Sequence, residues 1–112
     1  IKEVPNSVQK LMNEKNLQLE QVDYFIMHQA NMLMNETIRR KLQVPLDKTP
    51  YSLDQFGNTS SASIPLTMVT RLADQLQSPK NLLLSGFGVG LSWGNIFLEK
   101  QTIDCLQLIE VA

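Results

Sequence analysis

The chain has 112 residues, a length that supports one domain with a single hydrophobic core. Hydrophobic residues make up 43% and charged residues 19%, and the net charge of −1 lacks the basic excess that nucleic-acid or anionic-membrane binding requires. No apolar run approaches the roughly 20 residues of a membrane-spanning helix. A single cysteine, Cys105, excludes an internal disulfide and favours the cytoplasm. We therefore expect a cytoplasmic protein with no nucleic-acid partner and no membrane span.

Helix and strand patterns alternate along the chain. Apolar residues at helical spacing predict helices over about 5–15, 30–43 and 60–76. Short apolar runs predict strands over 23–27, 81–87 and 92–99, with a weaker candidate at 49–53. Residues 102–111 form either another strand or a tail. This alternation predicts an α/β fold with a mixed, mostly parallel sheet, and the short link before the final strand makes that strand antiparallel.

Three loops at strand ends carry polar or glycine-rich sequences, and ligands bind at such ends in open α/β sheets. They are HQAN (28–31), which holds the only histidine of the chain, FGNTSSASIP (56–65) and SGFGVGLSWG (85–94). Each loop taken alone has a structural explanation. The first two fit helix caps and turns, and the third fits a tight connection between antiparallel strands.

Two motif matches fail on mechanics. Residues 90–94 match the G-x-S-x-G nucleophile elbow, but a strand follows where that motif needs a helix, and the histidine lies upstream. The glycines of 86–90 match part of a dinucleotide fingerprint, but no crossover helix follows to receive a pyrophosphate.

The combination of HQAN, GNTSSASIP (57–65) and GFGVGLSWG (86–94), in this order and spacing, resembles the C-terminal half of β-ketoacyl–acyl carrier protein synthase III. That family belongs to the thiolase-like superfamily, and the resemblance runs from about residue 5 to residue 99. It implies one partial C-terminal thiolase-like domain over 1–100, without its first central strand, and a tail or extra strand over 101–112.

The resemblance also implies a reaction. Full-length members accept an acyl group from coenzyme A on a cysteine and condense it with malonyl–acyl carrier protein, releasing carbon dioxide in fatty acid biosynthesis. His28 and Asn58 align with the family histidine and asparagine, which donate hydrogen bonds to the enolate oxygen. Neutral imidazole and amide donors suit this task because they stabilise developing negative charge. We expect no metal and no cofactor beyond the two thioester substrates.

The glycine-rich loop is expected to hold the acyl thioester. The aligned backbone donor is Val89, flanked by Gly88 and Gly90, with Phe87 as the wall of the pocket.

Basic residues at the end of the second predicted helix correspond to a surface for the acidic carrier protein. They are Arg39, Arg40 and Lys41. Cations at this helix end also have a structural explanation, since they complement the helix dipole.

The family's nucleophilic cysteine belongs to the N-terminal half, which this chain lacks. Cys105 lies beyond the last matched strand and fits a small apolar residue better than a nucleophile. We therefore expect the chain alone to be inactive and its missing N-terminal half to be a partner. We also expect a homodimer, formed through the apolar helix at 60–76.

Two further functions stay open at this point. One is a specialised acyltransferase that uses another acceptor, and the other is a non-catalytic α/β interaction module. Joint retention of His28 and Asn58 favours condensation, because a scaffold needs neither donor.

Overall fold

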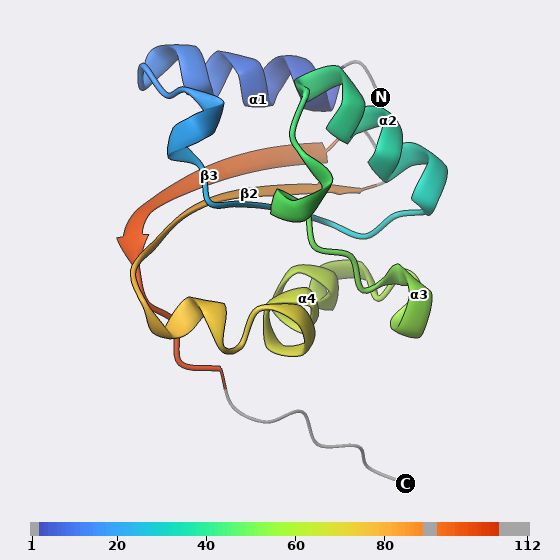
Figure 1. Ribbon diagram of the computed structural model, residues 1–112. Coiled ribbons are helices and arrows are strands. Elements are labelled where there is room, and N and C mark those ends of the chain that lie inside the picture. Colours follow the sequence, from blue (N-terminus) through green and yellow to red (C-terminus); the bar gives the residue numbers. More distant parts are fainter. Residues whose placement is uncertain (1–2, 89–91, 106–112) are drawn as a thin grey trace, which may run out of the picture.

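A computed structural model describes residues 3–88 and 92–105 of the chain (Figure 1). The strands are β1 (Tyr24–Met27), β2 (Lys80–Gly88) and β3 (Ser92–Gln101). They form one sheet in the order β1-β2-β3, in which β1 is parallel and β3 antiparallel to β2. The fold is α/β with a mixed sheet and an antiparallel final strand, as predicted. Among the described strands, however, the two kinds of pairing occur once each.

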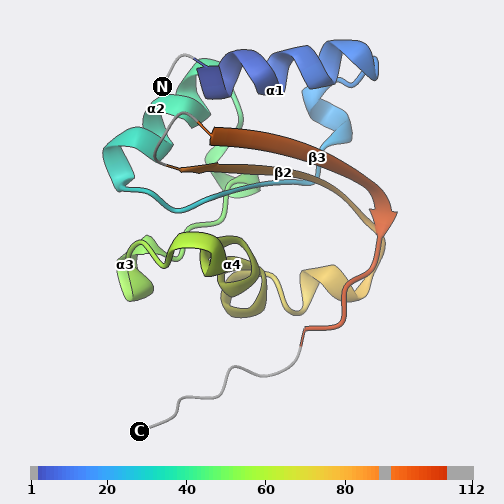
Figure 2. The same cartoon turned by 180° about the vertical axis from the view of Figure 1, so that it is seen from behind.

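Helices lie on both sides of the sheet. They are α1 (Glu3–Glu14), α2 (Met32–Leu42), α3 (Leu53–Phe56) and α4 (Ser63–Arg71). Shorter 3₁₀ turns occur at Leu19–Gln21, Leu46–Lys48, Ser60–Ala62 and Gln75–Gln77. Both views place α1 and α2 on one side of the sheet, with α3 and α4 on the other (Figures 1 and 2).

The apolar run in β1 is continuous because both of its faces are covered. Phe25 and Met27 pack in one cluster with apolar residues of α1 and α2. Ile26 packs in a second cluster with Leu72 and Leu76, which follow α4. A fully buried side chain of this size stabilises the fold by about 1.5–3 kcal/mol relative to an exposed one.

The first two helices match their predicted ranges within about two residues. In α1, Val4, Val8 and Met12 are buried at a spacing of four residues, and they form the face that packs on the sheet. In α2, the side chain of Asn31 accepts a hydrogen bond from the backbone N–H of Met34 and caps the helix. The structural explanation of Asn31 as a cap is therefore confirmed.

The predicted strand at 49–53 is wrong. Thr49 ends a 3₁₀ turn, where its hydroxyl donates to the carbonyl of Pro45, and α3 begins at Leu53. The backbone N–H of Ser52 donates to the side chain of Gln29 at 3.0 Å. A strand needs a neighbouring strand to pair with. The backbone here is satisfied instead by local turns and by the side chains of Gln29 and Arg71.

The predicted helix at 60–76 is three shorter pieces in the structure. The α-helical part ends at Arg71, and the backbone of the next residue, Leu72, leaves the helical region at φ −125° and ψ 11°. Leu72 and Leu76 are nevertheless buried against the sheet. The apolar pattern therefore identified Leu72 and Leu76 as buried. Within α4 itself, however, the buried residues are the polar Ser63 and Thr67, and the apolar ones are partly exposed.

The last strands agree with the prediction, and β3 continues through Gln101. Residues 102–105 form no strand, and the N–H of Ile103 donates to the carbonyl of Leu76 at 2.9 Å. The remainder of the predicted tail or strand, 106–111, lies outside the described residues. Among the helices that the structure describes, none combines the length and the hydropathy needed to cross a bilayer.

Candidate active site

The backbone of His28 is held on both sides immediately after β1. Its N–H donates to the carbonyl of Ser85 at 2.9 Å, which extends the parallel ladder beyond Met27. Its carbonyl accepts from the side chain of Asn35 in α2 at 2.8 Å. These two hydrogen bonds fix the backbone of His28, and so the position from which its side chain extends, at the end of the strand.

Gln29, the next residue, is fully buried and structural. Its amide nitrogen donates to the carbonyl of Met27, its amide oxygen accepts from Ser52, and its backbone N–H donates to Ser63 Oγ at 3.1 Å. It therefore ties the strand end both to the segment before α3 and to α4. The HQAN loop thus contains one residue turned toward the cavity described below and two residues that hold the backbone around it.

The His28 ring lies between α4 and β2. Nδ1 is 2.9 Å from Ser63 Oγ and 3.2 Å from the carbonyl oxygen of Ser60. Phe87 contacts the ring edge-to-face, with 5.1 Å between centroids and 86° between planes. These contacts on two sides restrict the rotation of the imidazole.

His28 and Asn58 line the same cavity, which has a volume of about 630 Å³. Its lining comes from the end of β1, the segment before and within α4, the end of β2 and the start of β3. The residues are His28, Asn58, Ser60, Ser61, Ser63, Ile64, Gly86, Phe87, Gly88 and Trp93. Of these lining residues, His28 alone is ionisable, so the described wall is formed by neutral and apolar groups.

Asn58 reaches this cavity through a turn that requires Gly57. Gly57 has φ +63° and ψ −153°, a region that is essentially restricted to glycine. Directly after it, Asn58 Oδ1 accepts the backbone N–H of Ser60 at 2.9 Å. This hydrogen bond occupies the amide oxygen, so the NH₂ group is the donor that Asn58 can offer.

The glycine-rich loop contributes Phe87 and Gly88 to the same wall. The predicted thioester contacts at Val89 and Gly90 lie outside the described residues. The opposite strand adds Trp93, which pairs directly with Phe87 in the antiparallel register.

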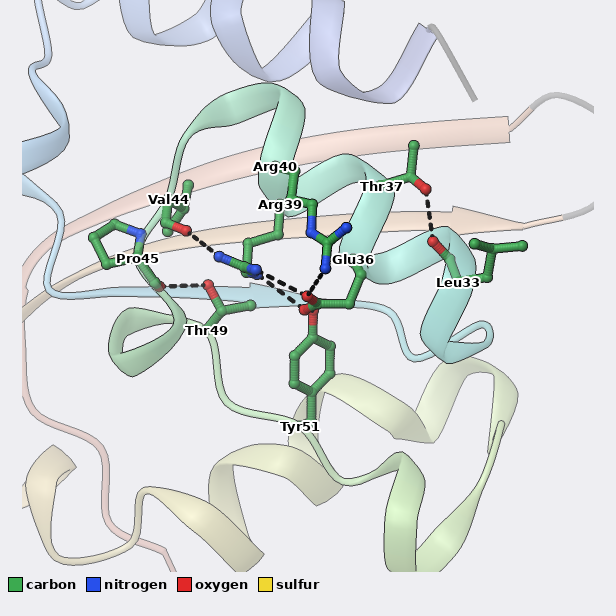
Figure 3. Close-up of polar contacts among 9 residues, drawn as sticks. All are labelled: Leu33, Glu36, Thr37, Arg39, Arg40, Val44, Pro45, Thr49 and Tyr51. Atoms are coloured by element: carbon green, nitrogen blue, oxygen red, sulfur yellow. Dashed lines mark hydrogen bonds and ion pairs between the residues drawn. The ribbon is translucent and has the colours of Figure 1, made fainter.

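Of the predicted docking residues, Arg39 is engaged within the fold. Its guanidinium forms a two-point ion pair with Glu36 and donates to the carbonyl of Val44, and its side chain is only 16% exposed (Figure 3). Arg40 is 75% exposed and lies 3.7 Å from Glu36. Lys41 is also exposed. The three basic residues therefore have different surroundings.

Tyr51 completes the cluster around Glu36, with its hydroxyl 2.6 Å from the carboxylate (Figure 3). The hydrogen bonds from Arg39 and Tyr51 lower the pKa of Glu36 from 4.5 to about 2. Burial, together with the hydrogen bond to Glu36, raises the pKa of the Tyr51 hydroxyl. This cluster joins α2 to the segment before α3.

The sequence did not single out Ser63 or Trp93, although both line the cavity. Nothing in the sequence separates Ser63 from the neighbouring serines, and it faces the histidine because of its position on α4. Trp93 could have been found from its cross-strand position opposite Phe87. In the described part of the chain, no three His, Cys, Asp or Glu side chains come together as a metal site requires.

Comparison with known proteins identifies the family. Residues 12–100 match the family described as "3-Oxoacyl-[acyl-carrier-protein (ACP)] synthase III C terminal". The chain belongs to this family. It is 41% identical over 98 residues to the beta-ketoacyl-[acyl-carrier-protein] synthase III of Pyropia yezoensis, and 40% identical over 98 residues to that of Limosilactobacillus reuteri. Each match covers 87% of this chain and 30% of the relative.

Solved structures of the family share the fold. A 3-oxoacyl-(acyl-carrier protein) synthase from Burkholderia xenovorans matches with a TM-score of 0.89 at 34% identity, covering 96% of this chain and 31% of that protein. The 3-oxoacyl-(acyl carrier protein) synthase III from Pseudomonas aeruginosa matches with a TM-score of 0.81 at 30% identity, covering 89% and 32%. The chain thus spans about a third of these synthases, in a thiolase-like fold.

Proposed function

We propose that this chain is the C-terminal part of a β-ketoacyl–acyl carrier protein synthase III that condenses acyl-coenzyme A with malonyl–acyl carrier protein. The observation that carries the proposal is the shared cavity of His28 and Asn58. The two residues are 30 positions apart and are brought to the same wall by the strand end at β1 and the glycine turn before α4. Their role in this chain is to donate hydrogen bonds to the enolate oxygen.

Decarboxylation of the malonyl thioester explains why two neutral hydrogen-bond donors are needed. When malonyl thioester loses carbon dioxide, the C–C bond breaks and its electron pair passes into an enolate, whose oxygen becomes negative. A neutral imidazole and an amide can both donate to that oxygen without placing a full charge in the site. The described wall has no carboxylate to repel the anion. One preorganised donor of this kind contributes roughly 3–4 kcal/mol to the barrier reduction.

Arg40 and Lys41 are better placed than Arg39 to bind the carrier protein. Both side chains are exposed at the end of α2 and can contact an acidic surface. Arg39 would first have to break its ion pair with Glu36. The N-terminal part of the synthase and a second copy of the enzyme are further partners under this proposal. The substrates are the two thioesters, without another cofactor.

A chimera tests the role of His28. This chain replaces the matching C-terminal segment of the L. reuteri synthase III, to which it is 40% identical. Cysteine acylation by acetyl-coenzyme A and decarboxylation of malonyl–acyl carrier protein are then measured separately. We expect His28→Ala to reduce decarboxylation by roughly 100- to 1,000-fold, as for loss of an oxyanion donor, and to reduce acylation much less.

Two controls accompany this measurement. Ser78→Ala, at an exposed serine outside the cavity, is the matched control and should leave both steps unchanged. The isolated chain should acquire no acetyl group by mass spectrometry, since Cys105 packs with the apolar cluster beneath α4. If His28→Ala reduces both steps equally, the histidine has a structural role. If His28→Ala leaves condensation unchanged, the chain takes part in a different acyl transfer or serves as a scaffold.

A further inference from the structure

The contacts of His28 Nδ1 bear on which ring nitrogen carries the proton. A neutral imidazole has one N–H, and the other nitrogen can only accept. Nδ1 is placed against Ser63 and Ser60. Among the described residues, Nε2 has no hydrogen-bond partner in the protein, so it is the nitrogen left for a molecule in the cavity. Whether Nε2 donates or accepts is therefore decided at Nδ1.

Ser63 Oγ is the atom on which these contacts converge. Ser63 is 1% exposed, and its Oγ accepts the backbone N–H of Gln29 at 3.1 Å. Because that N–H occupies one side of the oxygen, the hydroxyl proton points to one of two acceptors. These are the Ser60 carbonyl oxygen and His28 Nδ1, both at 2.9 Å.

The two positions of this proton have opposite consequences. If the hydroxyl donates to Ser60, its oxygen can accept from Nδ1–H, and Nε2 becomes an acceptor. If the hydroxyl donates to Nδ1, the ring proton resides on Nε2, which becomes a donor. The Ser60 carbonyl does not depend on the hydroxyl, because the backbone N–H of Ser63 already donates to it in the 3₁₀ turn. At Nδ1 the two neighbours act in opposite directions: the Ser60 carbonyl, 3.2 Å away, can only accept and favours Nδ1–H. The Ser63 hydroxyl, at the shorter distance of 2.9 Å, is the donor that favours Nε2–H.

We propose that Ser63 is a positioning residue that sets the tautomer of His28. Its hydroxyl donates to Nδ1 and keeps the ring proton on Nε2, facing the cavity. The value of this tautomer for catalysis depends on the enolate-donor function proposed above, but its existence does not. Gln29 assists by orienting the hydroxyl through its backbone N–H.

Nitrogen NMR of the full chain tests the proposal directly. His28 is the only histidine, so the spectrum of ¹⁵N-labelled protein contains a single imidazole. In alkaline solution, long-range proton–nitrogen correlations show which nitrogen of the neutral ring carries the proton. We expect Nε2–H to predominate in the unmodified chain. We expect Ser63→Ala to shift the proton to Nδ1, where the Ser60 carbonyl is the remaining acceptor.

Two further variants make the result interpretable. Ser61→Ala removes a hydroxyl from the same wall and should leave the tautomer unchanged. Ser63→Cys, whose thiol is a weak donor of similar shape, should shift the equilibrium as Ser63→Ala does and serves if the alanine variant does not fold. Predominance of Nδ1–H in the unmodified chain, or the same tautomer in the folded Ser63 variants, would overturn the proposal. This readout is separate from the rates in the chimera, so either proposal can fail alone.

Discussion

At the scale of single residues, Glu36 combines partners at helical spacing with a partner that is distant in the sequence. Its pairs with Arg39 and Arg40 follow from helical spacing at i+3 and i+4. The hydrogen bond from Tyr51 comes from a residue 15 positions away. Because side chains on three sides hold the carboxylate in its charged form, protonating it in the folded state is unfavourable.

Glu36 therefore makes stability depend on pH in a predictable direction. Its pKa is about 2 in the folded state and 4.5 ordinarily, so the unfolded chain binds the extra proton between these values. The contribution is complete above about pH 4.5 and is lost as the pH falls through about 2. We expect the free energy of unfolding to decrease over this window, and Glu36→Gln to flatten the decrease. Urea titrations followed by circular dichroism at several pH values measure it.

Glu14→Gln at the exposed end of α1 is the control for this experiment. It removes one carboxylate without touching the cluster. A variant Glu36→Gln with the same pH dependence as the unmodified chain would show that the cluster does not hold the carboxylate in its charged form.

At the scale of elements, the start of α2 is attached to the candidate site by one amide. Asn35 is fully buried, accepts the N–H of Ala30 at 2.9 Å and donates to the carbonyl of His28 at 2.8 Å. It thus satisfies two backbone groups in the loop between β1 and α2. An apolar residue on this face of the helix could pack there, but it could not replace either hydrogen bond.

We predict that Asn35→Ala destabilises the chain. A buried polar group left without its partner costs about 1–3 kcal/mol, and this substitution affects two. The change should appear as a lower urea midpoint, compared with Asn13→Ala, whose side chain is exposed near the end of α1. If the urea midpoint of Asn35→Ala falls no further than that of Asn13→Ala, water replaces the hydrogen bonds of the Asn35 amide in the loop.

At the scale of the whole molecule, α4 has apolar residues on more than one side. Ile64 and Met68 pack against the cluster beneath the sheet, whereas Leu66 and Val69 belong to neither apolar cluster and are half-buried. The most exposed large apolar side chains lie elsewhere. They are Leu33, Leu46, Ile96, Met32 and Trp93. We therefore consider two sites of self-association: the side of α4 that carries Leu66 and Val69, and the start of α2 with Met32 and Leu33.

We predict that the chain self-associates at micromolar concentration through α4. Sedimentation velocity should show a coefficient that rises with protein concentration, and Leu66→Glu should abolish the rise because it places a charge on the outward side of the helix. Leu33→Glu, at a residue that is 80% exposed near the start of α2, is the matched comparison. If Leu33→Glu alone prevents association, the contact belongs to α2. A monomer at all concentrations would reject both.

Local patterns in the sequence were sufficient to predict most elements. The spacing of Val8, Leu11 and Met12 predicted α1. The apolar run at 23–27 predicted a buried strand. The short connection between the last two strands required antiparallel pairing for steric reasons alone. These predictions succeeded because periodicity and chain length act over a few residues and do not depend on the rest of the fold.

Other features were decided only by tertiary structure. Residues 49–53 include the β-forming Thr49 and Tyr51, but their backbone groups bond to local turns and to the side chains of Gln29 and Arg71. Arg39 carries the same charge as Arg40, yet Tyr51 and Glu36 enclose it within the fold.

The site itself divides in the same way. The order and spacing of its motifs were enough to suggest the family and to select His28 and Asn58, since residue type and order are properties of the sequence. The sequence could not show that Ser63, among several nearby serines, lies 2.9 Å from His28 Nδ1. That distance depends on how α4 packs against the sheet, and such packing joins groups far apart in the chain, whose separation no local pattern records.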